Sequence, residues 1–175
     1  TSTQINEKNN KKGDWHADWP FCVFNGGNIN KPFPKKVLHI TCIFMLVDFN
    51  KNVGSTLVRP RSHLLDTNPT FEGDPYYGNY DDQVNIEGIA GSVFLMDSRL
   101  WHASDTNKSN KRRTSLVVRY APWWLNLEVF RPGSYDRKKI IEDKNKFGSL
   151  YPSVTKVAFD KIDDDVKSLF EHWLE

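Results

Sequence analysis

Residues 13–21 read GDWHADWPF and place a histidine and an aspartate two positions apart. In a β-strand the side chains alternate between two faces, so His16 and Asp18 are expected on one side and Trp15 and Trp19 on the other. An imidazole and a carboxylate side by side are candidate ligands for a divalent metal ion. For a motif this short, the alternative is a solvated polar face over an aromatic core, so the rest of the chain has to decide.

A second stretch, residues 91–124, supplies further residues of the same chemistry. His102 follows an expected strand and a short DSRLW connection, and Arg113 lies eleven positions later, at the start of the next strand. Together, His16, Asp18 and His102 provide two imidazoles and one carboxylate. This is the ligand set of the facial triad in non-haem Fe(II) oxygenases, which leaves three positions on the iron open.

Short strands separated by turn residues have to position these side chains, because the periodicity is mainly that of a β-protein. The one helical pattern runs from Ile162 to Leu174, behind three aspartates, and we expect this helix either to pack against the barrel or to bind a partner. A long loop at 65–83 contains three tyrosines. Strands are expected over residues 14–19 and 37–49, over two short segments within 83–97, and from 112 to Pro122. Residues 57–63 follow a turn and end in the RPRSH loop.

Composition narrows the classes of protein and partner. The chain has 24 Lys and Arg against 22 Asp and Glu, and these charges are scattered, so it lacks the basic stripe of a nucleic-acid-binding protein. The longest strongly apolar run, CIFMLV, is too short to span a bilayer. Cys22 and Cys42 cannot form a disulfide framework, which favours a reducing, cytoplasmic location. A small-molecule substrate is therefore expected, with neither nucleic acid nor membrane as partner.

Four stretches in this order give the chain a resemblance to the phytanoyl-CoA dioxygenase family of Fe(II)- and 2-oxoglutarate-dependent oxygenases. They are WHADWPF, DFNKNVGSTLVRPRSH, GSVFLMDSRLWHAS and the basic residue eleven positions after His102. The resemblance covers most of the chain and implies a single dioxygenase domain over residues 1–175. The implied fold is mainly β, a double-stranded β-helix (jelly roll, cupin-like) with a C-terminal helix. Since only fifteen residues precede His16, we expect the domain to lack the N-terminal part of the family.

Carried over to this sequence, the family's motifs imply that His16, Asp18 and His102 bind Fe(II). They also imply that Arg113 pairs with the distal carboxylate of 2-oxoglutarate, the cosubstrate. Ser104, two positions after the last ligand, matches a position that hydrogen-bonds the same carboxylate. The chemistry is suitable, since a guanidinium grips a carboxylate through two parallel hydrogen bonds.

Asp18 also indicates the type of reaction. Relatives that halogenate carry a small residue in place of this carboxylate, so its presence implies hydroxylation. The implied reaction consumes O2, converts 2-oxoglutarate to succinate and CO2, and hydroxylates a small organic molecule. Two alternatives stay open. One is a cupin-like metal enzyme that does not use 2-oxoglutarate, against which Arg113 counts, and the other is a non-catalytic jelly-roll binding module, which a missing ligand would favour.

Several arginines near these motifs have two interpretations each. Arg59 and Arg61 either hold an anionic substrate or are solvated loop cations, and Arg61 stands where the family's loop has glycine. Arg119 shares the strand parity of Arg113, so it either faces the cavity or forms a salt bridge in the wall, whereas Arg112 faces the opposite way. His63 is expected to be structural, His172 to lie on a helix surface, and His39 to be a hydrogen-bonded residue of the barrel wall or, if it points inward, to line the pocket. The tyrosines form either a lid over the substrate or the packing of their own loop, and the tryptophans are expected in core or rim packing: Tyr76, Tyr77, Tyr80, Trp101, Trp123 and Trp124.

Overall fold

The computed structural model of the protein describes residues 2–19, 32–67, 69, 76–122, 154–171 and 174. The chain divides into two compact units, of which the first comprises Thr1–Phe21 and Ile29–Trp124 and the second Cys22–Asn28 and Leu125–Glu175. The first unit contains the strands and the candidate ligands discussed below. A single dioxygenase domain over the whole chain stays a prediction.

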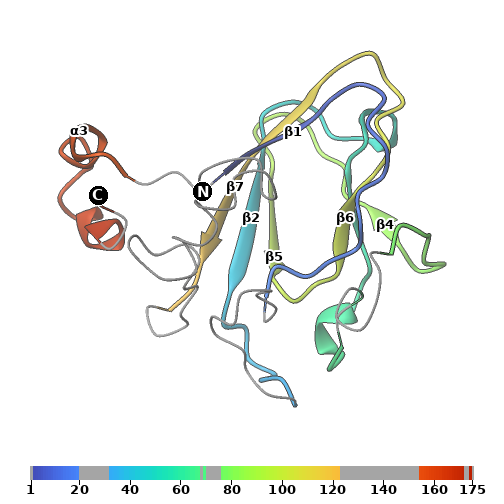
Figure 1. Ribbon diagram of the computed structural model, residues 1–175, viewed down its shortest axis with the longest axis horizontal. Helices are drawn as coiled ribbons and strands as arrows, with labels where there is room; N and C mark the ends of the chain where they lie inside the picture. Colours follow the sequence, from blue (N-terminus) through green and yellow to red (C-terminus); the bar gives the residue numbers. More distant parts are fainter. Residues whose placement is uncertain are drawn as a thin grey trace, which may run out of the picture. The chain divides into compact units, whose positions relative to one another are not determined.

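Two antiparallel sheets form the first unit (Figure 1). The described strands are β1 (Ser2–Asn6), β2 (Ile40–Met45), β3 (Thr56–Val58), β4 (Val84–Asn85), β5 (Val93–Asp97), β6 (His102–Ser104) and β7 (Arg113–Tyr120). One sheet has the order β1-β7-β2-β5 and the other the order β4-β3-β6. The chain therefore passes from one sheet to the other between β2 and β3, β4 and β5, β5 and β6, and β6 and β7. This alternation is the arrangement expected for a jelly roll.

The predicted strand at 14–19 is wrong as a continuous strand. Only His16 forms a bridge, with His102, before the chain bends. The bend has a clear cause, because the backbone amides of Asp18 and Trp19 both donate to the carbonyl oxygen of Ser98, at 2.9 and 3.3 Å, and leave the ladder. The inside-outside alternation of the side chains nevertheless persists.

The other predicted strands lie where the hydrophobic pattern places them, but they are shorter than the predicted ranges. In β2, the consecutive residues Thr41, Cys42 and Ile43 are all buried, which confirms the expectation of a strand covered on both faces. β1 and β6 were not expected as strands. β6 has only three residues, which is too short for a periodic pattern, and β1 is polar and pairs along the edge of β7.

A cluster of buried aromatic and aliphatic residues covers the outward face of the three-stranded sheet. Trp15 and Trp101 are its largest members, and Leu57 and Ala103 pack with them from β3 and β6. The ring of Tyr80 packs against the cluster, with its centroid 5.1 Å from that of Trp15. The aromatic residues that flank the candidate ligands therefore form core on the side away from them.

The helix predicted from Ile162 to Leu174 is wrong in its place. In the described part of the C-terminal region the α-helix is α3 (Lys156–Phe159), which ends before that range begins. The hydroxyl of Thr155 caps it by accepting from the amide of Ala158 at 3.2 Å. Residues 162–171 form turns and the 3-10 helix η4 (Lys167–Leu169) instead. Three successive aspartates at 163–165 have low helix propensity, which disfavours a continuous helix there.

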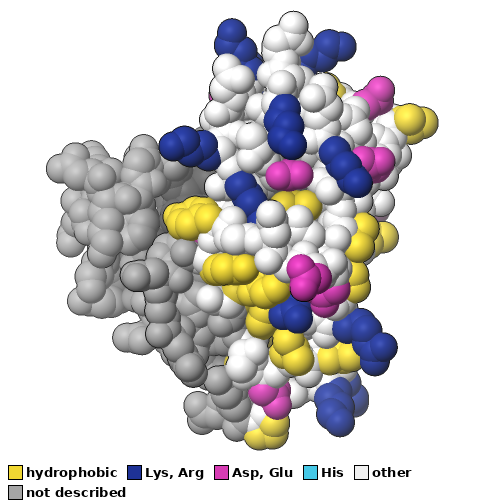
Figure 2. Space-filling view, turned by 90° about the vertical axis from the view of Figure 1, so that its right-hand side faces the viewer, with side chains coloured by type: hydrophobic (Ala, Val, Ile, Leu, Met, Phe, Trp, Pro, Cys, Tyr) yellow, Lys and Arg dark blue, Asp and Glu magenta, His cyan; other side chains and the backbone are white. Residues whose placement is uncertain are grey.

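The surface shown in Figure 2 carries mixed charge. Lys and Arg side chains alternate with Asp and Glu side chains on this face, and apolar side chains lie between them. This face therefore has no stripe of positive charge. Among the helices formed by the described residues, none has the length and apolar character needed to cross a bilayer.

Candidate metal centre

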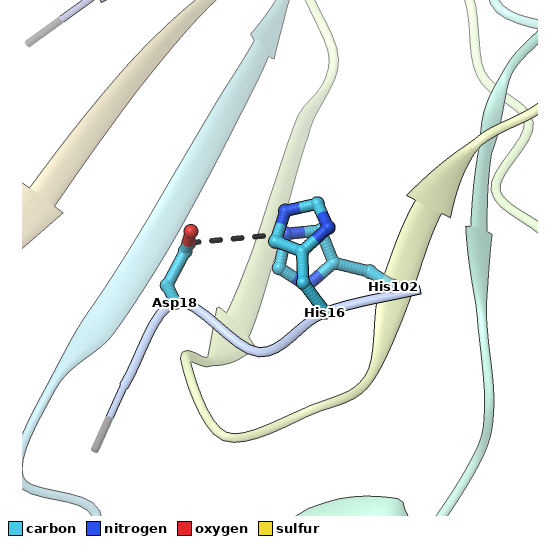
Figure 3. Close-up of side chains that lie close together, drawn as sticks. All are labelled: His16, Asp18 and His102. Carbon is cyan, nitrogen blue, oxygen red and sulfur yellow. Dashed lines mark ion pairs between the residues drawn. The ribbon is translucent and has the colours of Figure 1, made fainter. Parts of the chain in front are cut away.

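The three predicted ligands converge in the first unit (Figure 3). His16 and Asp18 come from the segment before β2, and His102 is the first residue of β6. The ring centroids of the two histidines are 4.3 Å apart, and His102 Nε2 lies 3.9 Å from Asp18 Oδ2. Each residue offers one ligand atom within 4.8 Å of the other two. The residues are therefore close enough to bind one ion together.

Each of the two histidines is oriented by a hydrogen bond between its Nδ1 and the backbone carbonyl two residues earlier. His16 Nδ1 lies 3.0 Å from the carbonyl oxygen of Asp14, and His102 Nδ1 lies 2.9 Å from that of Leu100. A carbonyl oxygen only accepts hydrogen bonds, so each Nδ1 carries the proton. This tautomer leaves the Nε2 lone pair of both rings available for a metal ion.

Asp18 is buried and is held through both of its oxygens. Arg119 Nη2 donates to Oδ1 at 2.9 Å, and Thr41 Oγ1 donates to Oδ2 at 2.8 Å. Burial raises the pKa of Asp18, but the charges of His102 and Arg119 lower it more, so the pKa lies below its usual value. Burial and the neighbouring His16 lower the pKa of His102 to about 4. At neutral pH the site thus offers a carboxylate and a neutral imidazole, the protonation states that metal binding requires.

The candidate ligands open on a pocket between the two sheets. Alternate residues of β7 form one wall, as expected for one face of a strand. The lining residues are Gln4, His16, Asp18, Thr41, Ile43, Thr56, His102, Ala103, Ser104, Arg113, Ser115, Val117 and Arg119. The predicted cosubstrate-binding residues Arg113 and Ser104 thus share a pocket with the predicted metal ligands, and Arg119 both faces the cavity and forms a salt bridge.

Arg113 is a buried cation that has no counter-charge among the described residues. Its residue is 3% exposed, its Nη2 lies 3.5 Å from Ser104 Oγ, and its guanidinium carbon lies 4.7 Å from the ring centroid of Phe49. Among the described residues, its Nε has no hydrogen-bond partner and no carboxylate forms an ion pair with it. Burial lowers the pKa of Arg113 to about 10, so it stays charged at neutral pH. An unpaired buried charge costs several kcal/mol, so this position is suited to an anionic ligand.

Arg112 shows the opposite environment, as strand parity predicts. Its side chain is exposed and pairs with Glu7, with 2.8 Å between Nη2 and Oε1. The pocket also contains three hydroxyl residues that the sequence reasoning missed, Thr41, Thr56 and Ser115. Ser115 Oγ is buried and has no partner in the described part of the chain, and its position two residues after Arg113 was a usable signal. For Thr41 no sequence signal exists, because its contact with Asp18 depends on the fold.

Two further arginines lie away from the pocket. Arg59 donates from Nε to both carboxylate oxygens of Asp82, at 3.0 and 3.1 Å, and its guanidinium carbon lies 4.4 Å from the ring centroid of Tyr80. These contacts support a structural role. Arg61 is exposed, and its φ of 66° is in the left-handed region that favours glycine, so the loop keeps the backbone that suits the family's residue at this position.

The other candidates have mostly structural surroundings. None of the loop tyrosines lines the pocket, and the rings of Tyr76 and Tyr80 contact each other, with centroids 5.0 Å apart. These contacts favour the interpretation that the loop packs on the aromatic cluster, and they disfavour a lid over the substrate. His63 lies in the 3-10 helix η2 (Ser62–Leu64), and His39 is buried and hydrogen-bonded to Ser98. His172, Trp123 and Trp124 lie outside the described residues.

Comparison with known proteins agrees with the motifs. Residues 1–115 match the profile of the family described as phytanoyl-CoA dioxygenase (PhyH). Two uncharacterised proteins, one from Mycobacterium bovis and one from Mycobacterium tuberculosis, are each 32% identical to the chain over 80 residues. This match spans 46% of the chain and 28% of the length of these curated relatives.

One solved structure, that of EvdMO1, resembles the chain with a TM-score of 0.50 and 22% sequence identity. The likeness covers 69% of this chain and 26% of that one, and at this identity it concerns the fold, in agreement with the predicted jelly roll. The family profile covers about two thirds of the chain and includes all four stretches that carry the resemblance. The chain therefore belongs to the phytanoyl-CoA dioxygenase family of Fe(II)- and 2-oxoglutarate-dependent oxygenases.

Proposed function

We propose that the chain is a Fe(II)- and 2-oxoglutarate-dependent hydroxylase that acts on a small organic molecule and forms succinate and CO2. The observation that carries this proposal is the content of one pocket. It combines a His, Asp and His set with a buried guanidinium that has no counter-charge among the described residues. The first fits an iron ion and the second fits the distal carboxylate of the cosubstrate.

The metal ligands in this proposal are Nε2 of His16, Nε2 of His102 and Oδ2 of Asp18. Both rings already have Nδ1 engaged by a backbone carbonyl, so no rearrangement of the tautomer is needed. Two neutral nitrogens and one carboxylate oxygen are a donor set that suits Fe(II) and leaves coordination positions for a cosubstrate and O2.

Arg113 holds the distal carboxylate of 2-oxoglutarate in this proposal, and Ser104 and Ser115 donate to the same group. The guanidinium and the Ser104 hydroxyl are already neighbours, and Ser115 offers a buried hydroxyl without a partner among the described residues. A carboxylate at this point would satisfy all three groups at once. The pairing would also fix the direction in which the cosubstrate points toward the metal ligands.

When bound, Fe(II) would activate O2, the oxidant, with 2-oxoglutarate as the reductant, so that one oxygen atom enters a C–H bond of the substrate and the other enters succinate. The balance is substrate, 2-oxoglutarate and O2 on one side, and hydroxylated substrate, succinate and CO2 on the other. The protein orients both reactants and excludes water, with Ile43 and Val117 contributing apolar wall to the pocket. Asp18 keeps a metal position occupied by a carboxylate, which favours hydroxylation over halogenation.

A succinate-release assay with Fe(II), O2 and a panel of small molecules, run on the complete polypeptide, tests the proposal. We expect succinate formation that requires both Fe(II) and 2-oxoglutarate and that is lost in His16→Ala. Binding of Fe(II) without any binding of 2-oxoglutarate would instead support a cupin-like metal enzyme of another type. Absence of metal binding would support a non-catalytic binding module. A small-molecule substrate and a cytoplasmic location belong to the same proposal.

A further inference from the structure

Asp18 has more support than the other candidate ligands. A chain of side-chain hydrogen bonds leads away from its Oδ2 into the protein interior. Thr41 Oγ1 lies 2.8 Å from Asp18 Oδ2, Ser98 Oγ lies 2.6 Å from Thr41 Oγ1, and His39 Nδ1 lies 2.6 Å from Ser98 Oγ. Thr41, Ser98 and His39 are each at most 1% exposed.

The direction of every bond in this chain follows from the carboxylate. An ionised carboxylate only accepts, so the single hydroxyl proton of Thr41 is donated to Asp18. Thr41 then accepts from the hydroxyl of Ser98, and Ser98 accepts from His39. His39 therefore carries its proton on Nδ1, and its buried Nε2, which has no partner among the described residues, is a bare lone pair.

Ser98 also fixes the backbone of Asp18. The Ser98 carbonyl oxygen accepts from the amide of Asp18 at 2.9 Å, and the Ser98 amide donates to the carbonyl oxygen of His39 at 3.0 Å. One buried residue thus holds both the main chain and, through Thr41, the side chain of the candidate ligand. On the other side of the carboxylate, Arg119 holds Oδ1 at 2.9 Å.

We infer that Thr41, Ser98 and His39, together with Arg119, are positioning residues that keep Asp18 a one-oxygen ligand. The inference rests on the proposed metal site. Arg119 occupies Oδ1 and so prevents it from turning toward the metal, while the Thr41 hydroxyl directs Oδ2 and leaves it a lone pair. A carboxylate that bound through both oxygens would take one of the positions needed by the cosubstrate or O2.

The test measures binding of Ni(II) alone by calorimetry, without 2-oxoglutarate, in matched variants. Thr41→Val removes the hydroxyl and keeps the shape, and Thr41→Ser restores the hydroxyl. Ser98→Ala cuts the chain at its centre, and His39→Leu and His39→Asn differ in whether a donor remains near the Nδ1 position. Thr114→Val is the control, because it makes the same chemical change on the face of β7 that points away from the pocket.

We expect Thr41→Val and Ser98→Ala to weaken Ni(II) binding by about tenfold or more, as loss of a residue that orients a metal ligand generally does. Thr41→Ser, His39→Asn and Thr114→Val should bind close to the parent, and His39→Leu more weakly than His39→Asn. Infrared difference spectra with 13C-labelled aspartate, metal-loaded minus metal-free, report the carboxylate directly. They should show the wide separation of its two stretching bands typical of one-oxygen binding in the parent, a changed separation in Thr41→Val, whose Asp18 Oδ2 loses its donor, and a narrower one in Arg119→Ala, whose Asp18 Oδ1 is released.

Each outcome bears on one hypothesis. A parent chain that binds no Ni(II) overturns the metal site and the proposed function with it. A parent that binds Ni(II), with Thr41→Val and Ser98→Ala equal to Thr114→Val in affinity and in the infrared bands, overturns the positioning role alone. Should Thr41→Val or Ser98→Ala fail to fold in thermal unfolding, the pair His39→Leu and His39→Asn decides, because equal affinities would contradict the inference.

Discussion

Arg113 and Arg119 lie on the same face of the same strand, six positions apart, yet their surroundings are opposite. Arg113 is buried and has no counter-charge among the described residues, whereas the Arg119 side chain is 25% exposed and pairs with Asp18 at 2.9 Å. Along a strand this separation is about 20 Å. Arg119 is thus neutralised by the carboxylate that it holds, whereas the absence of such a partner for Arg113 among the described residues supports the proposal that an external anion binds there.

The pairing of β7 explains the difference. Arg119 lies opposite Thr41 in the ladder with β2, which brings it beside the carboxylate that Thr41 holds. The described ladder between β2 and β7 ends at Met45 and Ser115, so Arg113 is beyond it and lies opposite Asn6 of β1 instead. No acidic residue is contributed from β1, whose sequence is STQIN.

Replacing Asp18 by glycine gives the largest expected effect, because it removes a ligand and makes Arg119 as unpaired as Arg113. We expect Ni(II) affinity to fall by more than about 100-fold, beyond the usual cost of losing a residue that only orients a ligand, and hydroxylation to stop. Trp15 and Trp19 point away and should keep the fold. Calorimetry, succinate release and thermal unfolding of Asp18→Gly beside the parent measure the three properties. Hydroxylation at the parent's rate would show that Asp18 is not a ligand.

Acid should act on the Asp18 end of the pocket and not on the Arg113 end. Burial lowers the pKa of His39 to about 4, below its value near 6.5 in the unfolded chain. Between these values the unfolded chain binds the proton and the native chain does not, so stability is lost as the pH falls from about 6.5 to about 4. His39 accounts for about 3 kcal/mol of this loss. His102, whose pKa is also lowered to about 4, adds a loss over the same range that a His39 variant keeps. Urea unfolding of the metal-free parent and of His39→Asn across this range measures it, and an equal slope in both would contradict the assignment to His39.

Arg113→Ala should weaken 2-oxoglutarate binding by about 2–3 kcal/mol, or roughly 100-fold, because the cosubstrate carboxylate loses its partner in a buried pocket. Ni(II) binding should change little. The matched control is Arg112→Ala, since Arg112 is exposed and pairs with Glu7. Titration of 2-oxoglutarate into the three Ni(II)-loaded proteins provides the comparison. Identical curves for the two variants would remove Arg113 from its assigned role.

Arg119→Ala should give the reverse pattern and the smallest effect. We expect Ni(II) binding to weaken by about tenfold, because the carboxylate of Asp18 loses one of its two supports, while 2-oxoglutarate affinity at saturating Ni(II) stays near the parent value. Arg119→Lys should recover part of the loss. If Arg119→Ala instead weakens 2-oxoglutarate as strongly as Arg113→Ala does, the two cations do not have separate tasks.

The convergence of the candidate metal ligands was predictable because it depends on local parity and on motifs. His16 and Asp18 alternate with Trp15 and Ala17 even though most of the segment is not a strand, since burial of the apolar residues fixes the side to which the others point. Arg113 was distinguishable from Arg112 by the same alternation. These properties are contained in a few neighbouring residues.

The supports of Asp18 were not predictable, because they depend on register between distant segments. Thr41, Ser98 and His39 meet only when β2 pairs with β5 and the segment after β5 folds back on Asp18. Arg119 had two interpretations until its position opposite Thr41 was known. The sequence missed β6 and the position of α3, which lies at 156–159 and not at 162–174, for a different reason. Elements of three or four residues carry little periodic signal.

β1 pairs with β7 from Ser2 to Asn6 and so covers the backbone edge of the strand that carries Arg113. It is fastened at its end, where Asn6 Nδ2 donates to the carbonyl oxygens of Gly54 and Asp105 at 3.0 Å each, and Asn107 Nδ2 donates to the carbonyl oxygen of Asn6 at 3.0 Å. Without these five residues β7 would present a row of free amide and carbonyl groups to other molecules. Removing them is therefore expected to promote edge-to-edge aggregation and to lower the solubility of the protein.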